Sequence, residues 1–218
     1  MIDYAAARLT MVESQLRTNK VMDEAVLDAF LAVPRERFTP PALRGAAYVD
    51  DDLPLGGGRY LMQPMVLARL LQLAAIGRGD RVLEVGCATG YGTALLARLA
   101  RSVVAIESEV ELARQAMARL RELGIGNVAV LEAPLAAGYP GRAPYDVILF
   151  EGAVQRIPDA VAQQLADRGR LVAVVQEEGG MGRAVLMGSA GGVLSRRACF
   201  DAAVPLLPGF QAEPSFVF

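Results

Sequence analysis

Short apolar runs alternate with amphipathic stretches through the middle of the 218-residue chain. Five of these runs have the length of buried strands and occur at residues 81–85, 102–107, 127–131, 145–150 and 169–175. Residues with helical spacing separate the first three runs, and a shorter helical stretch begins at Pro158. Apolar strands that alternate with helices form a parallel sheet covered on both faces. The pattern therefore predicts an α/β fold with a doubly wound, mostly parallel, Rossmann-like sheet.

The residues before these runs are organised differently. Residues 5–18 show helical spacing, and a second helix is expected after Asp23, whose side chain can cap the first turn. Residues 55–58, Leu-Gly-Gly-Gly, predict a flexible loop. A third helix is expected to begin at Pro64, because proline suits the first turn of a helix. The chain is thus expected to start with a helical segment.

The last third of the chain changes character again. Residues 183–187 and 192–200 predict two antiparallel strands with no helix between them, and residues 177–182 predict a turn before them. We expect the whole chain to form a single domain. In it, an N-terminal helical segment (residues 1–62) packs on the sheet of a Rossmann-like core (residues 63–218) and covers one edge of a ligand site.

The composition excludes several kinds of chemistry. The chain has no histidine, which removes Ser-His-Asp and Cys-His catalysis and every histidine-ligated metal site. The two cysteines, Cys87 and Cys199, form no metal-binding cluster, and two unpaired thiols agree with a reducing cytoplasm. A net charge of −2 offers no electrostatic footprint for nucleic acid. Any reaction must therefore use a bound cofactor, carboxylates, hydroxyls or backbone groups, and no resident metal is expected.

A glycine-rich turn follows the first apolar run. Gly86 and Gly90 bracket it, and a strand, a glycine turn and a helix in this order offer backbone N–H groups to a nucleotide-like ligand. A dinucleotide fingerprint would require glycine at positions 86, 88 and 91, where the chain has Gly86, Ala88 and Tyr91. The spacing therefore argues against NAD and FAD.

Two acidic residues flank this turn. Glu84 interrupts the apolar run before it, and a buried carboxylate without a partner would cost several kcal/mol. Glu107 ends the next apolar run, about 20 residues after the first glycine, where an acidic residue binds a ribose in this kind of fold. The combination resembles motif I and the ribose-binding acid of class I S-adenosyl-L-methionine (SAM) methyltransferases. This resemblance implies SAM as cofactor, with contacts from Glu84, Gly86, Cys87, Ala88, Gly90, Glu107, Ser108, Glu132 and Ala133.

Segments outside the generic SAM fold narrow the resemblance from the class I methyltransferases to one family. The most specific are Val33-Pro-Arg-Glu-Arg-Phe38 and Gln63-Pro64, and others are Gln15-Leu16, Leu53-Pro-Leu-Gly56, Ile157-Pro158 and Gly169-Arg-Leu-Val172. With them the chain resembles the protein-L-isoaspartate (D-aspartate) O-methyltransferase family over nearly its full length. The resemblance implies transfer of the SAM methyl group to the α-carboxylate of an isoaspartyl residue in damaged protein. The ester then collapses to a succinimide, which begins protein repair.

The positions that the family uses for the substrate are changed in this chain. The resemblance places them at Leu61, Met62, Gln63, Glu151, Gly152, Val174 and Val175. Met62 stands where the family has a functionally important serine, and a thioether cannot donate a hydrogen bond to a substrate carboxylate. Glu151 adds a charge near the expected position of an anionic substrate. Residues 133–135 lack the family's acid near the adenine, for which Glu132 is the nearest replacement.

Three functions are open at this point. The first is a SAM-dependent carboxyl O-methyltransferase for isoaspartyl protein or peptide, acting in the cytoplasm as a monomer or weak homodimer without nucleic-acid or membrane partners. It needs no general base and no residue receives a catalytic role, because a carboxylate is already ionised and the enzyme supplies proximity and exclusion of water. The second is a methyltransferase of the same fold with another acceptor, which Met62 and Glu151 would suit. The third is a SAM-binding or regulatory protein without turnover.

Overall fold

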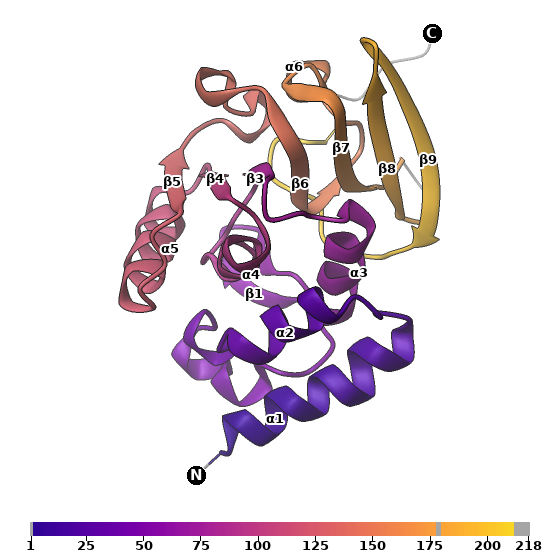
Figure 1. Cartoon of the computed structure of the whole chain (residues 1–218). Helices are drawn as coiled ribbons and strands as arrows, with labels where there is room; N and C mark the ends of the chain where they lie inside the picture. Colours follow the sequence, from indigo (N-terminus) through magenta and orange to yellow (C-terminus); the bar gives the residue numbers. More distant parts are fainter. Residues whose placement is uncertain (1, 178–179, 212–218) are drawn as a thin grey trace, which may run out of the picture.

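The computed structural model describes residues 2–177 and 180–211, and its centre is a seven-stranded sheet (Figure 1). The strands are β3 (Arg81–Val85), β4 (Ser102–Glu107), β5 (Val128–Glu132), β6 (Tyr145–Val154), β7 (Leu165–Val175), β8 (Arg183–Ala190) and β9 (Val193–Asp201). In space they follow the order β5-β4-β3-β6-β7-β8-β9, with β8 and β9 antiparallel to their neighbours and the others parallel. The predicted fold class and the predicted antiparallel pair are confirmed. Of the turn expected at residues 177–182, positions 178 and 179 lie outside the described residues.

The helices cover the two faces of this sheet unequally. They are α1 (Tyr4–Met11), α2 (Glu24–Ala32), α3 (Pro64–Ala74), α4 (Tyr91–Leu99), α5 (Val110–Glu122) and α6 (Asp159–Ala162). One face is packed by α3, α4 and α5. The other is packed by the short α6, the 3₁₀ turn η5 (Leu135–Ala137) and two residues near the C-terminus, Leu207 and Phe210. Prolines 134, 140 and 144 interrupt the chain between β5 and β6, which explains why 3₁₀ turns stand there in place of a helix. Within the described residues, no helix is long and apolar enough to cross a membrane.

The helices of the N-terminal segment pack on other helices and not on the sheet. α1 continues as a π-helical turn, η1 (Val12–Leu16), and a 3₁₀ turn, η2 (Arg17–Asn19). α2 follows Asp23, which caps it as predicted by accepting the N–H groups of Ala25 and Val26. In Figure 1, α1 and α2 lie below α3 and α4, and α2 contacts both of those helices. The expectation that this segment packs on the sheet is wrong for its helices, because α3 and α4 already cover that face. Its residue Arg59 does reach the sheet, at Glu107 on the end of β4.

Residues 53–61 form a hairpin where the sequence predicted a flexible loop. β1 (Leu53–Gly56) pairs antiparallel with β2 (Arg59–Leu61). The glycines at 56, 57 and 58 have φ values of 92°, 58° and 72°, a left-handed region that glycine enters without steric cost. The triplet therefore makes the tight turn, and the hairpin fixes the position of Arg59.

Arg35 connects the N-terminal segment to the residues around the glycine turn. The side chain is fully buried, and it donates from Nε to the carbonyl of Ala47 (2.7 Å) and from Nη2 to that of Met62 (2.9 Å). Its guanidinium lies over the ring of Tyr91, the first residue of α4, at 4.9 Å from the centroid. One arginine therefore holds three separate parts of the chain together.

Replacement of Arg35 by methionine is expected to lower the free energy of unfolding by about 2 kcal/mol. The variant keeps much of the buried volume but leaves the carbonyls of Ala47 and Met62 without a donor, and an unsatisfied buried group costs roughly 1–3 kcal/mol. Urea denaturation measures the loss. The matched control is Arg44→Met at an exposed position, expected within about 0.5 kcal/mol of the wild type. A loss no larger than that of the control would contradict the structural role of Arg35.

Candidate active site

The glycine turn, from Gly86 to Gly90, folds around the end of β4. Gly86 and Ala88 both have left-handed backbone, with φ of 84° and 49°. The unusual conformation of Ala88 directs its N–H to the carboxylate of Glu107 at 2.7 Å. Cys87 is fully buried between them, and burial raises the pKa of its thiol, which makes it unreactive. The turn thus contacts Glu107 directly, through the N–H of Ala88.

Glu107 holds a fully buried carboxylate at the end of β4. It accepts the N–H groups of Ala88 (2.7 Å) and Ser108 (2.9 Å), and Arg59 donates to it from Nη2 (2.9 Å) and Nε (3.3 Å). Burial alone would raise the pKa of Glu107, but the hydrogen bonds and charge of Arg59, together with the backbone donors, hold this pKa below its usual value. The structure therefore places an ionised carboxylate at the position predicted to bind a ribose.

Side chains of the protein itself occupy the space over the turn. Arg59 donates from Nη2 to the carbonyl of Gly86 (2.8 Å), and Cδ2 of Leu207 would lie 2.9 Å from a Cβ at Gly86. Both side chains are buried. The sequence predicted that Gly86 permits the close approach of a ligand, whereas here Arg59 and Leu207 approach it. Sequence reasoning missed both residues: an arginine directly after a glycine triplet was a weak signal, and nothing distinguished Leu207.

Glu84 and Glu151 form a buried pair of carboxyl groups beside α4. Glu84 lies on β3 and Glu151 on the neighbouring β6, and a Cβ at Gly92 would overlap an oxygen of each. Oε2 of Glu84 accepts the hydroxyl of Thr93 (2.5 Å). Among the described residues, no other group donates to Oε1 of Glu84 or to either oxygen of Glu151, so these oxygens have only the neighbouring carboxyl group as a hydrogen-bond partner. β6 extends past its predicted end, so Glu151 and Gly152 are strand residues.

Burial and mutual proximity change the ionisation of this pair. Burial raises the pKa of Glu84 to about 7. Burial, together with the neighbouring charge of Glu84, raises the pKa of Glu151 well above its ordinary value. Two carboxyl groups this close cannot both be ionised at low cost. The pair therefore retains a proton near neutral pH, and Glu151 adds less negative charge to the site than the sequence alone suggested.

Three of the predicted substrate positions meet at one small cavity. Its volume is about 10 Å³, and Met62, Glu151 and Gly152 line it together with Asp52, Arg59 and Leu206, among others. Gln63 lies beside it, where its N–H donates to Asp52 (2.8 Å) and its side-chain amide to the carbonyl of Ala203 (3.0 Å). Leu61 is fully buried in the core. The structure thus gathers the segment before α3 and the end of β6 at one place.

Four other predicted site residues are placed differently. Val174 and Val175 lie on β7 beside the end of β6, but neither lines this cavity, and Val174 is fully buried. Glu132 ends β5 in register with Glu107, although its side chain is exposed. The N–H of Ala133 donates to the carbonyl of Glu107 (3.1 Å). Glu132 and Ala133 are therefore neighbours of Glu107 along the sheet edge, whereas the two valines are separate from the cavity.

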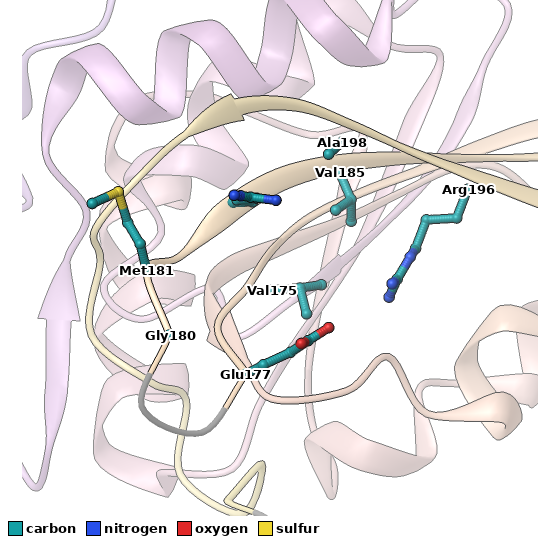
Figure 2. A pocket seen from close by; sticks show the side chains of 8 residues that line it. Val175, Glu177, Gly180, Met181, Val185, Arg196 and Ala198 are labelled. Atoms are coloured by element: carbon teal, nitrogen blue, oxygen red, sulfur yellow. The ribbon is translucent and has the colours of Figure 1, made fainter.

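A larger pocket lies over β7, β8 and β9 (Figure 2). Its volume is about 390 Å³, and Val175, Glu177, Met181 and Arg196 are among the residues that line it. The glycine turn follows β3, and β6 lies between β3 and β7 in the sheet, so the turn is separated from this pocket. The buried carboxyl groups and the inward-pointing N–H groups converge at the turn and the small cavity. We therefore place the candidate active site there and not in the larger pocket.

Solved structures share this architecture. One described as a protein-L-isoaspartate O-methyltransferase aligns with a TM-score of 0.81 and 27% identity over 93% of this chain, which spans about two thirds (66%) of that structure. A Plasmodium falciparum protein in complex with S-adenosyl-L-homocysteine aligns with a TM-score of 0.80 and 16% identity over 95% of this chain and 99% of that one. At that identity the second alignment shows the fold alone. The fold is the Rossmann-like fold of SAM methyltransferases.

Sequence relatives identify the family. The profile of the protein-L-isoaspartate (D-aspartate) O-methyltransferases matches residues 7–195. The protein-L-isoaspartate O-methyltransferase of Methylorubrum extorquens is 47% identical over 82% of this chain and 78% of its own length. That of Koribacter versatilis is 42% identical over 78% of this chain and 76% of its own length. The chain belongs to the protein-L-isoaspartate (D-aspartate) O-methyltransferase family.

The family is SAM-dependent, so the fit of this cofactor can be tested on the structure. The glycine turn and the ionised Glu107 are groups that suit a ribose, but Arg59 already binds Glu107 and Leu207 covers Gly86. The adjoining cavity of about 10 Å³ is far smaller than the roughly 300 Å³ or more of a ligand pocket. In this conformation the residues do not fit SAM.

Proposed function

We propose that this protein is a SAM-dependent carboxyl O-methyltransferase that methylates the α-carboxylate of isoaspartyl residues in damaged proteins. The observation that carries the proposal is the ionised Glu107, which accepts the N–H of Ala88 in the glycine turn, in a chain that matches the family from residue 7 to residue 195. Relatives named protein-L-isoaspartate O-methyltransferase support the choice of substrate. Two unpaired cysteines, of which Cys87 is buried, support a cytoplasmic location.

The reaction requires little from ionisable side chains. SAM supplies a methyl group on a sulfonium, and the substrate carboxylate is ionised at neutral pH, so the protein contributes alignment and exclusion of water. With Arg59 and Leu207 displaced from the turn, Glu107 would hold the ribose and Glu84 the amino-acid end of the cofactor. Met62 offers no hydrogen-bond donor to the substrate carboxylate, so another residue at the cavity must bind it.

Transfer of labelled methyl groups from SAM to an isoaspartyl peptide tests this proposal. We expect base-labile label on the isoaspartyl peptide and none on an aspartyl peptide of the same sequence, because methyl esters hydrolyse in base. If neither peptide is labelled although calorimetry shows SAM binding, the isoaspartyl acceptor is rejected and a methyltransferase with another acceptor is favoured. If SAM does not bind either, SAM-dependent activity itself is rejected.

A further inference from the structure

Arg59 faces two parts of the candidate site at once. On one side its guanidinium binds Glu107 at 2.9 Å and the carbonyl of Gly86 at 2.8 Å. On the other side it lines the small cavity that Met62 and Glu151 also line. The side chain is 2% exposed, so its charge depends on partners within the protein. Arg59 therefore stands at the boundary between the proposed cofactor and substrate positions.

Leu207 completes the closure of the turn. Its N–H donates to the carbonyl of Ala153 (2.8 Å), and the N–H of Ala153 donates to the carbonyl of Pro205 (2.9 Å), which joins the C-terminal segment to the end of β6. Its side chain would lie 2.9 Å from a Cβ at Gly86 and 2.6 Å from one at Gly152. Protein atoms thus fill the space in which a ligand would lie against Gly86.

A ribose and Arg59 compete for the same carboxylate. Both oxygens of Glu107 already accept backbone N–H groups, from Ala88 and from Ser108, so a diol needs the positions that Arg59 holds. A guanidinium displaced from a buried carboxylate requires another anion, because a buried charge without a partner is strongly destabilising. Entry of the cofactor therefore creates a need for a second partner of Arg59.

The cavity can supply that partner in the form of a substrate carboxylate. Arg59 is the only lysine or arginine among the residues that line it, and Met62 cannot donate a hydrogen bond. The planar guanidinium matches a carboxylate through two parallel hydrogen bonds. Asp52 and Glu151 also line the cavity, so an anion that enters it without Arg59 meets only acidic and neutral groups.

We propose that Arg59 exchanges partners: it closes the glycine turn by binding Glu107 when the cofactor is absent, and it binds the substrate carboxylate once the cofactor has taken Glu107. This inference rests on the proposed function and adds a substrate-binding residue and an order of binding, cofactor before substrate. Arg59 then supplies the donor that Met62 lacks.

Two affinities measured on Arg59→Gln test the exchange. By calorimetry, S-adenosyl-L-homocysteine is expected to bind this variant at least about tenfold more tightly than it binds the wild type, because the competing cation is gone. An isoaspartyl peptide, titrated with S-adenosyl-L-homocysteine present, is expected to bind about 10- to 100-fold more weakly, the range for lost hydrogen bonds to a charged group. Arg59→Lys keeps the charge and is expected to recover most of the peptide affinity.

A matched control is Arg170→Gln, which breaks the ion pair of Arg170 with Asp80 away from the turn. It is expected to leave both affinities unchanged. Equal affinity of the wild type and Arg59→Gln for S-adenosyl-L-homocysteine would overturn the closure of the turn. Unchanged affinity of Arg59→Gln for the peptide would overturn the proposal that Arg59 binds the substrate carboxylate. If Arg59 had a purely structural role, Arg59→Gln would bind both S-adenosyl-L-homocysteine and the peptide more weakly, and that outcome also overturns the proposal.

Leu207→Ala covers the case in which Arg59→Gln does not fold. It opens the turn without removing a charge, and it is expected to strengthen the binding of S-adenosyl-L-homocysteine. No change in the affinity for S-adenosyl-L-homocysteine would overturn the closure. Failure of the proposed function would give a different result. The wild type would bind S-adenosyl-L-homocysteine but would neither bind an isoaspartyl peptide nor transfer a methyl group to it. Leu207→Ala would still bind S-adenosyl-L-homocysteine more tightly than the wild type.

Discussion

Replacement of Glu107 by glutamine is expected to lower the free energy of unfolding by about 3–5 kcal/mol. The side chains of Arg59 and Glu107 are 2% and 0% exposed, and their charged atoms lie 2.9 Å apart. Glutamine keeps the shape of the side chain but removes its charge, which leaves the guanidinium buried without a counter-ion. The effect is large because the cost is that of an uncompensated charge and not of one lost hydrogen bond.

Urea denaturation measures this loss, and an exposed ion pair provides the control. Glu111→Gln breaks the surface pair with Arg114 and is expected to leave the stability nearly unchanged, because solvent screens an exposed ion pair. The double variant Arg59→Gln/Glu107→Gln removes both charges and is expected to recover much of the loss, so a double-mutant cycle isolates the coupling. If Glu107→Gln costs as little as Glu111→Gln, the two buried charges are not an interdependent pair.

Replacement of Glu151 by glutamine is expected to make the stability of the protein much less dependent on pH. Burial raises the pKa of Glu84 to about 7 from an ordinary value of 4.5, and it raises the pKa of Glu151 well above that value. Between about pH 5 and 7 the native protein therefore binds more protons than the unfolded chain. Stability falls as the pH rises through this window and is greatest at its acid end.

Other charged groups near the pair do not reverse this sign. Arg59 and Arg35 act to lower the pKa of Glu151, but burial outweighs them. Glu107 has a lowered pKa, so the stability linked to it is lost only as the pH falls below its ordinary value. The wild type is accordingly expected to lose on the order of 3 kcal/mol of stability between pH 5 and pH 8.

Urea denaturation at several pH values between 5 and 8 tests this expectation. At pH 8, Glu151→Gln is expected to be more stable than the wild type, because one group that must lose a proton is gone and the amide can donate to Glu84. At pH 5 the two proteins should be similar. Glu132→Gln, at an exposed position, is the control and should follow the wild type. A wild-type stability that is constant or rises from pH 5 to pH 8 would contradict the raised pKa values.

Features that depend on neighbouring residues were predictable from the sequence. β3 and β4 have the predicted bounds because apolar runs of that length end at turn residues, and Asp23 caps α2 through N–H groups two and three residues away. Errors occurred in the segment before α3, where packing against the rest of the chain decides the structure. Residues 53–61 pair with each other as a hairpin packed in the core, and the N-terminal segment meets helices that had already covered the sheet.

By itself, the sequence determined the α/β fold, the glycine turn and the place of Glu107 at a strand end, because periodicity and turn chemistry are local properties. The tertiary structure alone decided what lies against them. Arg59 precedes Glu107 by 48 residues, and no periodic pattern relates the two. The contact of Glu84 with Glu151 likewise depends on β3 and β6 being neighbours, and the pKa values of both depend on burial. Ionisation and closure of this site are therefore properties of the packed molecule.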